Sequence, residues 1–249
     1  MNLRAAQRAA SIAKVVNTMT ELALSIGEPF TSPAWESNFV VFAGESGNPI
    51  PEQHTKDYLR RCCKYAAHYE AWLVPERFIL LGYQCMGLVS PQGKVVGAQR
   101  GVFDGPVFHR QAERSTAAEV FPTEHGGVFL CVDTDVYRPE VARIAAGMGA
   151  QIIVCSQTIG KDDYASHMVL TGAWNAAQLA GCYVIAVSNQ FSCVSAPTQL
   201  TQQRDGFLSP PSLKKPMTQR FNVDKLAELR RPKPLSQKFY DLHREELIG

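Results

Sequence analysis

Three side chains in this sequence have the chemical types needed for nucleophilic catalysis, and all three lie at or just after the end of a strand-like segment. Cys131 and Asp133 lie two residues apart at the end of the apolar run 128–132, so we expect both side chains on one face of a strand. Glu45 follows the apolar run 39–42, next to Gly44. A thiolate can act as a nucleophile and a carboxylate as a general base. The structural alternatives are a buried strand cysteine and an exposed glutamate at a strand-to-loop junction.

The other reactive residue types do not indicate a metal or a cofactor. The seven cysteines are scattered without C-x-x-C pairs, and the six histidines do not supply the tight local spacing of a zinc site. The pattern G-x-G-x-x-G is absent. We therefore expect no metal, no cofactor, and cysteines that are mostly buried and reduced. His109, His125 and His167 could serve acid-base roles, although loop histidines are more often exposed.

Charge and hydropathy exclude two classes of partner. The chain of 249 residues has 25 Lys and Arg against 23 Asp and Glu, and the net charge of +2 argues against nucleic-acid binding as its main task. No apolar run approaches the roughly 20 residues of a membrane span, and the first four residues do not resemble a signal peptide. We expect a soluble, cytoplasmic protein.

The elements that would position these residues alternate between helices and strands. Helices are expected at residues 3–26, 55–72, 139–148 and 168–180, and strands at 39–42, 78–81, 86–89, 94–103, 128–132, 151–155 and 183–187. This order predicts an α/β protein with helices packed on sheets. One domain covers residues 1–197. The segment 198–249 is rich in Pro, Lys, Arg and Gln, which favours a closing segment and an extended arm that could contact a partner subunit.

Four segments, in the right order and at suitable separations, resemble the carbon-nitrogen hydrolase (nitrilase) superfamily. With a weaker closing match at Phe221-Asn222-Val223-Asp224, they span about residues 2–240. The segments are the strand 39–42 with Glu45, the stretch from Gly82-Tyr83-Gln84 through Pro91-Gln92-Gly93 to Arg100, the segment 126–156 with Asp133-Thr134-Asp135, Pro139-Glu140, Arg143 and Gly149-Ala150, and the segment 174–189 with Cys182-Tyr183-Val184-Ile185-Ala186.

The resemblance implies a four-layer αββα sandwich and an oligomer, normally a homodimer or larger. Family members begin with a strand ahead of the first helix, and this sequence begins where that strand should already have ended. Either the strand is missing or another segment takes its place. We expect that it is missing.

The resemblance also implies a catalytic triad that is incomplete here. The family hydrolyses amides or nitriles with a cysteine nucleophile, a glutamate base and a lysine that stabilises the tetrahedral intermediate. Glu45 matches the base, although Gly44 stands where proline is usual. Without a gap, the lysine position is Gly101 and the nucleophile position is Asp133, while Glu113 is the best match to a second family glutamate.

Two registers remain open for the nucleophile. If two extra residues are accommodated before Pro139, Cys131 takes the role and Arg110 or Arg114 could replace the lysine. These arginines and Gln157 are the candidate substrate-binding residues. The leading hypothesis is a binding or assembly subunit that is impaired or inactive as a hydrolase, with a small amide or nitrile-like ligand. The competing hypothesis is a diverged amidase that uses Cys131 and Glu45, and a third is a purely structural homo-oligomer.

Overall fold

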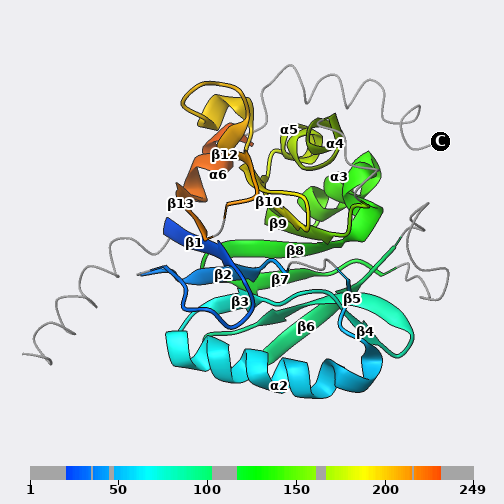
Figure 1. Cartoon of the computed structure of the whole chain (residues 1–249). Helices are drawn as coiled ribbons and strands as arrows, with labels where there is room; N and C mark the ends of the chain where they lie inside the picture. Colours follow the sequence, from blue (N-terminus) through cyan, green and yellow to red (C-terminus); the bar gives the residue numbers. More distant parts are fainter. Residues whose placement is uncertain are drawn as a thin grey trace, which may run out of the picture.

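The computed structural model describes residues 21–34, 36–44, 48–102, 117–160, 167–214 and 216–230. In these residues the chain forms two β-sheets stacked face to face, with helices on both outer sides (Figure 1). This arrangement confirms the α/β class. None of the helices in this part of the chain combines the length and apolarity that crossing a bilayer requires.

The first sheet has seven strands within the described residues, and its core is parallel. The strand order is β13-β1-β2-β3-β5-β4, and β6 also pairs with β5. β1, β2 and β3 run parallel, whereas β13 joins β1 in the antiparallel direction. The strands are β1 (Glu21–Gly27), β2 (Phe39–Phe42), β3 (Trp72–Val74), β4 (Phe78–Leu80), β5 (Tyr83–Val89), β6 (Val95–Arg100) and β13 (Met217–Asn222).

The second sheet has six strands in the same part of the chain, in the order β12-β11-β10-β9-β8-β7. Its three central strands, β8, β9 and β10, are parallel. Their carboxyl ends therefore lie at one edge of the sheet, where α/β proteins commonly bind ligands. The strands are β7 (Val120–Thr123), β8 (Gly126–Val132), β9 (Ala150–Gln157), β10 (Tyr183–Ser188), β11 (Ser192–Ser195) and β12 (Phe207–Ser212).

Alternation along β8 separates the two apolar layers of this sheet. Val128, Leu130 and Val132 pack between the sheets, whereas Phe129 and Cys131 pack against the outer helices. This division follows from the two-residue period of a strand. Both faces of β8 are buried, which explains its continuous apolar sequence.

Helices cover the outer face of each sheet and complete four layers. α2 (Glu52–Tyr69) packs on the first sheet through Tyr58, Cys62, Tyr65 and Ala66. On the second sheet lie α3 (Pro139–Gly147) and a helix formed by α4 (His167–Val169), a π-helical turn (Leu170–Trp174) and α5 (Asn175–Ala180). A short helix, α6 (Asp224–Leu229), follows β13. The αββα sandwich expected from the sequence is confirmed.

The helix expected at residues 3–26 is wrong in its last part, because Glu21–Gly27 forms β1. Leu22, Leu24 and Ile26 point into the core between the sheets, and this spacing of two residues is that of a strand. β1 lies between β13 and β2 in the first sheet. Residues 1–20 are outside the described residues.

The described part of the segment after residue 198 contributes a strand to each sheet. β12 joins the second sheet and β13 the first, and Phe221, Val223 and Leu226 belong to the core between the sheets. The described part of this segment therefore closes the sandwich. The expectation of an arm now concerns residues 231–249, which lie outside the described residues.

Candidate functional site

Asp133 occupies a sharp turn between β8 and the helices that follow. The strand ends at Val132, and Asp133 has a φ of +54°, in the left-handed region. The chain then forms a 3-10 helix (Asp133–Tyr137) and enters α3. A left-handed residue other than glycine is strained, although aspartate tolerates this conformation better than most. Strand-to-helix elbows present the nucleophile in some α/β enzymes.

The side chain at this elbow is held in a buried ion pair. Arg77, between β3 and β4, donates from Nη1 to Asp133 Oδ1 at 2.9 Å, and the two side chains are 2% and 1% exposed. The backbone N–H of Thr158 donates to the same oxygen at 3.2 Å, and Arg77 Nη2 donates to the Thr158 hydroxyl. Burial lowers the pKa of the Arg77 guanidinium, and the Asp133 carboxylate opposes that shift. The pair thus joins the first sheet to the second.

The second oxygen of Asp133 has a different environment. Asp133 Oδ2 is buried and has no hydrogen-bond partner among the described residues. Asp135, two residues on, instead accepts a hydrogen bond from the Val102 N–H at 3.0 Å. One carboxylate oxygen at the elbow therefore remains able to accept a hydrogen bond.

Cys131 is in a different environment from Asp133. It packs in the apolar layer beneath α3 and α5, where its side chain is 2% exposed. A hydrogen bond with Cys155 raises the pKa of the Cys131 thiol well above its usual range, and burial adds to the rise. The expectation that Cys131 and Asp133 point to one face is wrong, because the left-handed turn at Asp133 ends the strand and redirects its side chain.

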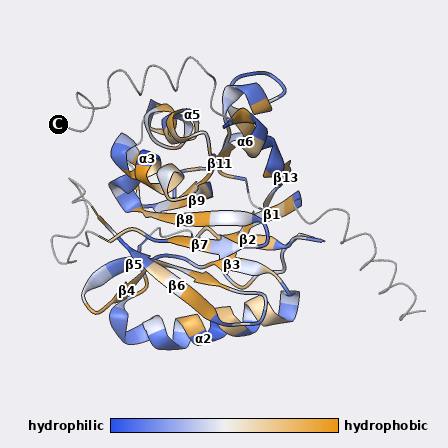
Figure 2. Cartoon of the chain, turned by 180° about the vertical axis from the view of Figure 1, so that it is seen from behind, coloured by the Kyte–Doolittle hydropathy of each residue, from blue (hydrophilic) through white to orange (hydrophobic). Residues whose placement is uncertain are grey.

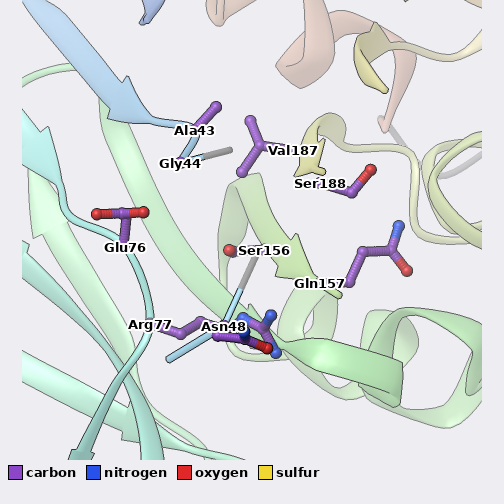
Figure 3. Close-up of a pocket in the computed structure, with 9 residues that line it drawn as sticks. All are labelled: Ala43, Gly44, Asn48, Glu76, Arg77, Ser156, Gln157, Val187 and Ser188. Carbon is purple, nitrogen blue, oxygen red and sulfur yellow. The ribbon is translucent and has the colours of Figure 1, made fainter. Parts of the chain in front are cut away.

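A small polar pocket lies beside Arg77, where the carboxyl ends of β2, β9 and β10 come together (Figure 3). The free space is about 10 Å³ for the centre of a water molecule, roughly what one water needs. Described residues that line it are Ala43, Gly44, Asn48, Glu76, Arg77, Ser156, Gln157, Val187 and Ser188. Arg77 connects this pocket to the elbow.

Two lining side chains have defined orientations. The Tyr137 hydroxyl donates a hydrogen bond to Gln157 Oε1 at 2.8 Å. The amide nitrogen of Gln157 can therefore donate a hydrogen bond to a different acceptor. Tyr58 of α2 fixes the position of Glu76 through two hydrogen bonds. Its hydroxyl accepts a hydrogen bond from the Glu76 N–H at 2.9 Å and donates one to Glu76 Oε2 at 3.4 Å. The Glu76 carboxylate lies directly against Gly44, where a Cβ would overlap it.

The sequence matches no protein-family model and no curated protein. Solved structures do match. A carbon-nitrogen hydrolase from Helicobacter pylori G27 superposes with a TM-score of 0.69 at 14% identity, over 86% of this chain and 93% of that one. A mutant amidase from Nesterenkonia sp. AN1, with the acetamide moiety of fluoroacetamide on its active-site cysteine, gives 0.65 at 14% identity, over 92% and 98%. The C. elegans NitFhit protein gives 0.65 at 12% identity, over 88% and 65%.

The chain has the carbon-nitrogen hydrolase fold. The matches cover most of this chain, as the segments quoted from the sequence predicted. Within this nitrilase-like fold, the elbow after β8 carries Asp133.

The structure brings together only part of the predicted site. Gln157 lines the pocket, and Asp133 is linked to the pocket by Arg77. Cys131 is not among the lining residues. Glu45, Arg110, Glu113 and Arg114 lie outside the described residues, so their assignments remain predictions.

Sequence reasoning missed Arg77, the buried partner of Asp133. Gly101, where the sequence resemblance places the family's lysine, donates its backbone N–H to the Gln84 carbonyl at 3.0 Å. Its neighbour Arg100 stacks on the Tyr83 ring at 4.1 Å. The available signal was the short charged sequence Glu76-Arg77 between two apolar runs, which places a charge close to the core.

Proposed function

We propose that this chain is a nitrilase-superfamily protein that binds a small polar ligand and does not hydrolyse C–N bonds. The observation that carries the proposal is the ion pair between Arg77 and Asp133 at the elbow after β8. In the ungapped register, a carboxylate bound by an arginine stands where the family places its thiolate nucleophile.

The ion pair is poorly suited to amide hydrolysis. Asp133 Oδ1 accepts hydrogen bonds from Arg77 and from the Thr158 N–H, and both donors stabilise its negative charge in place. Attack on an amide by either oxygen would form an acyl anhydride and expel an amine, which is a poor leaving group. Arg77 is also engaged by the carboxylate and is not free to stabilise an oxyanion on a substrate.

Cys131 does not replace the missing nucleophile in this proposal. Its thiol is buried under the helices, and its raised pKa keeps it protonated at neutral pH. A thiolate nucleophile needs the opposite environment, with a nearby positive charge and access to the substrate.

The pocket supports binding of a small amide or nitrile. Asn48, Ser156, Gln157 and Ser188 provide neutral hydrogen-bonding groups, and the free amide nitrogen of Gln157 can donate to a carbonyl or nitrile. The amidase of similar fold carries an acetamide moiety at its active site, which suggests the size of ligand to test. Because the free space holds about one water, such a ligand has to displace pocket side chains.

The test combines ammonia release with ligand-induced thermal stabilisation. We expect no ammonia above background from acetamide, propionamide, butyramide or acetonitrile, and a melting temperature that rises with the concentration of at least one of them. Gln157→Leu should abolish that rise, whereas Gln53→Leu on the exposed side of α2 should retain it.

Two results would overturn the proposal. Ammonia release that disappears in Cys131→Ala would establish the amidase alternative. A melting temperature unchanged by all four compounds would remove the basis for ligand binding in this pocket.

A further inference from the structure

Glu76 contributes the carboxylate among the described residues that line the pocket beside Arg77. Two neighbours place it there. Tyr58 binds it through two hydrogen bonds from α2, the helix that covers the outer face of the first sheet and carries hydrophilic residues on its solvent side (Figure 2). Gly44 leaves the space that the carboxylate fills, because a Cβ at residue 44 would overlap Oε1 and Cδ of Glu76. The position of this charge is therefore built into the fold.

The charged side chains at this pocket do not balance within the described residues. Arg77 also lines the pocket, but it forms the buried ion pair with Asp133. Burial lowers the pKa of Arg77, and Asp133 opposes that shift more strongly than Glu76 does. The two carboxylates and the one guanidinium leave a formal net charge of −1. A ligand with one positive charge would therefore complement the pocket better than a neutral ligand.

We propose that Glu76 makes the pocket selective for a small amidinium cation over the neutral amide of the same shape. This inference rests on the proposed function, because it assumes that a small polar ligand binds in the pocket. An amidinium has the planar shape of an amide, but it carries a positive charge and has N–H donors on both nitrogens. Two parallel, charge-assisted hydrogen bonds to one carboxylate are stronger than the bonds that a neutral amide can form with it.

Neighbouring groups can accept the other N–H groups of an amidinium. Gln157 Oε1 retains a second lone pair beside the hydrogen bond that it already accepts, and the Ser156 hydroxyl can also accept. Arg77 donates to Asp133 from Nη1 and to the Thr158 hydroxyl from Nη2, so both ends of its guanidinium are engaged at the elbow. As for an amide, lining side chains have to move, because the free space holds about one water.

Acetamide and acetamidinium test the inference in the full-length chain, because they match in size and differ in charge. The melting temperature is measured against the concentration of each compound at neutral pH, with sodium chloride holding the ionic strength constant. In the wild type, we expect acetamidinium to reach half of its effect at about a tenfold lower concentration than acetamide. Glu76→Gln should lose this preference, whereas the matched variant Glu28→Gln, at an exposed position after β1, should keep it.

Gly44→Ala provides a second variant in case Glu76→Gln does not fold. It keeps the negative charge but moves the carboxylate aside, so the preference for acetamidinium should fall here too. Equal half-effect concentrations for the two compounds in the wild type, or a preference that persists in Glu76→Gln, would overturn this inference and leave amide binding intact. A melting temperature that neither compound changes would overturn both proposals.

Discussion

Arg77 and Asp133 form a buried ion pair that joins the segment between β3 and β4 to the elbow after β8, with 2.9 Å between Nη1 and Oδ1. The two residues are 56 positions apart in sequence and follow strands of different sheets, β3 and β8. Two charges with almost no exposure to solvent depend on each other, because either charge alone would be buried without compensation.

Removing one partner should therefore destabilise the protein strongly. We expect Arg77→Met to lower the free energy of unfolding by about 3–5 kcal/mol. Arg77→Met/Asp133→Asn should recover much of that loss, since asparagine keeps the left-handed turn and leaves no unpaired charge. Urea unfolding measures the free energy of unfolding of both variants. As a control, Arg60→Met removes an exposed ion pair with Asp57 and should change little. Equal effects at the two arginines would refute a structural role for the buried pair.

Gly44 provides the space that the Glu76 carboxylate occupies. Gly44→Ala should lower the free energy of unfolding by no more than about 1 kcal/mol, because the added methyl group meets the end of a flexible side chain, which can move aside. The same substitution should cost less in a Glu76→Ala background. Gly147→Ala, where no atom lies within 4 Å of the added group, is the matched control and should be neutral or stabilising. An identical cost of Gly44→Ala in both backgrounds would contradict the overlap.

His125 should make stability depend on pH. It is buried in the turn between β7 and β8, and within the described part of the chain its ring nitrogens have no hydrogen-bond partner. Burial lowers its pKa, an effect that Glu124 opposes. Below about pH 6.5 the unfolded chain takes up a proton that the folded chain resists, so stability falls as pH falls toward the lower folded pKa.

The slope from this one group cannot exceed about 1.4 kcal/mol per pH unit. Denaturant unfolding between pH 8 and pH 5 should show a weaker decline in His125→Gln than in the wild type. His54→Gln, on the exposed side of α2, should leave the decline unchanged. If stability falls with pH in His125→Gln as steeply as in the wild type, another titrating group causes the pH dependence.

Thiol labelling should distinguish Cys63 from Cys131. Six of the seven cysteines are buried, and Cys63 is partly exposed. Burial raises the pKa of the Cys63 thiol, but the reagent can still reach it. In the native protein, one thiol should react with a disulfide reagent ahead of the others, and Cys63→Ser should remove that phase. Loss of the fast phase in Cys131→Ala would instead indicate an activated thiolate at Cys131.

Much of the fold could be predicted from local patterns. The strand at 39–42 and the helix near 139–148 have the periods of their elements, and the structure places β2 and α3 there. β1 was missed because Leu22 and Leu24 were assigned to the preceding helical pattern, although their spacing is that of a strand. β13 was expected only as a weak closing match, since a half-exposed edge strand has little apolar signal.

The site was less predictable, because its geometry depends on contacts between distant residues. The ungapped register placed Asp133 at the nucleophile position, and the structure places it at the elbow. No local pattern indicates that Arg77 reaches across the two sheets to meet it. The direction of the Asp133 side chain could not be predicted either. Side chains alternate between the two faces of a strand only while the backbone stays extended, and Asp133 has a positive φ.

The pairing of β13 with β1 constrains how the chain folds during synthesis. β1 gains its antiparallel neighbour only when residues 217–222 have left the ribosome, after nearly the whole sandwich has been made. Until then one edge of β1 presents unpaired backbone groups, the condition under which nascent strands associate wrongly. Closure by so distant a segment also raises the contact order, which predicts slow folding. A stall in translation before residue 217 would leave a sheet that is nearly complete but open at this edge.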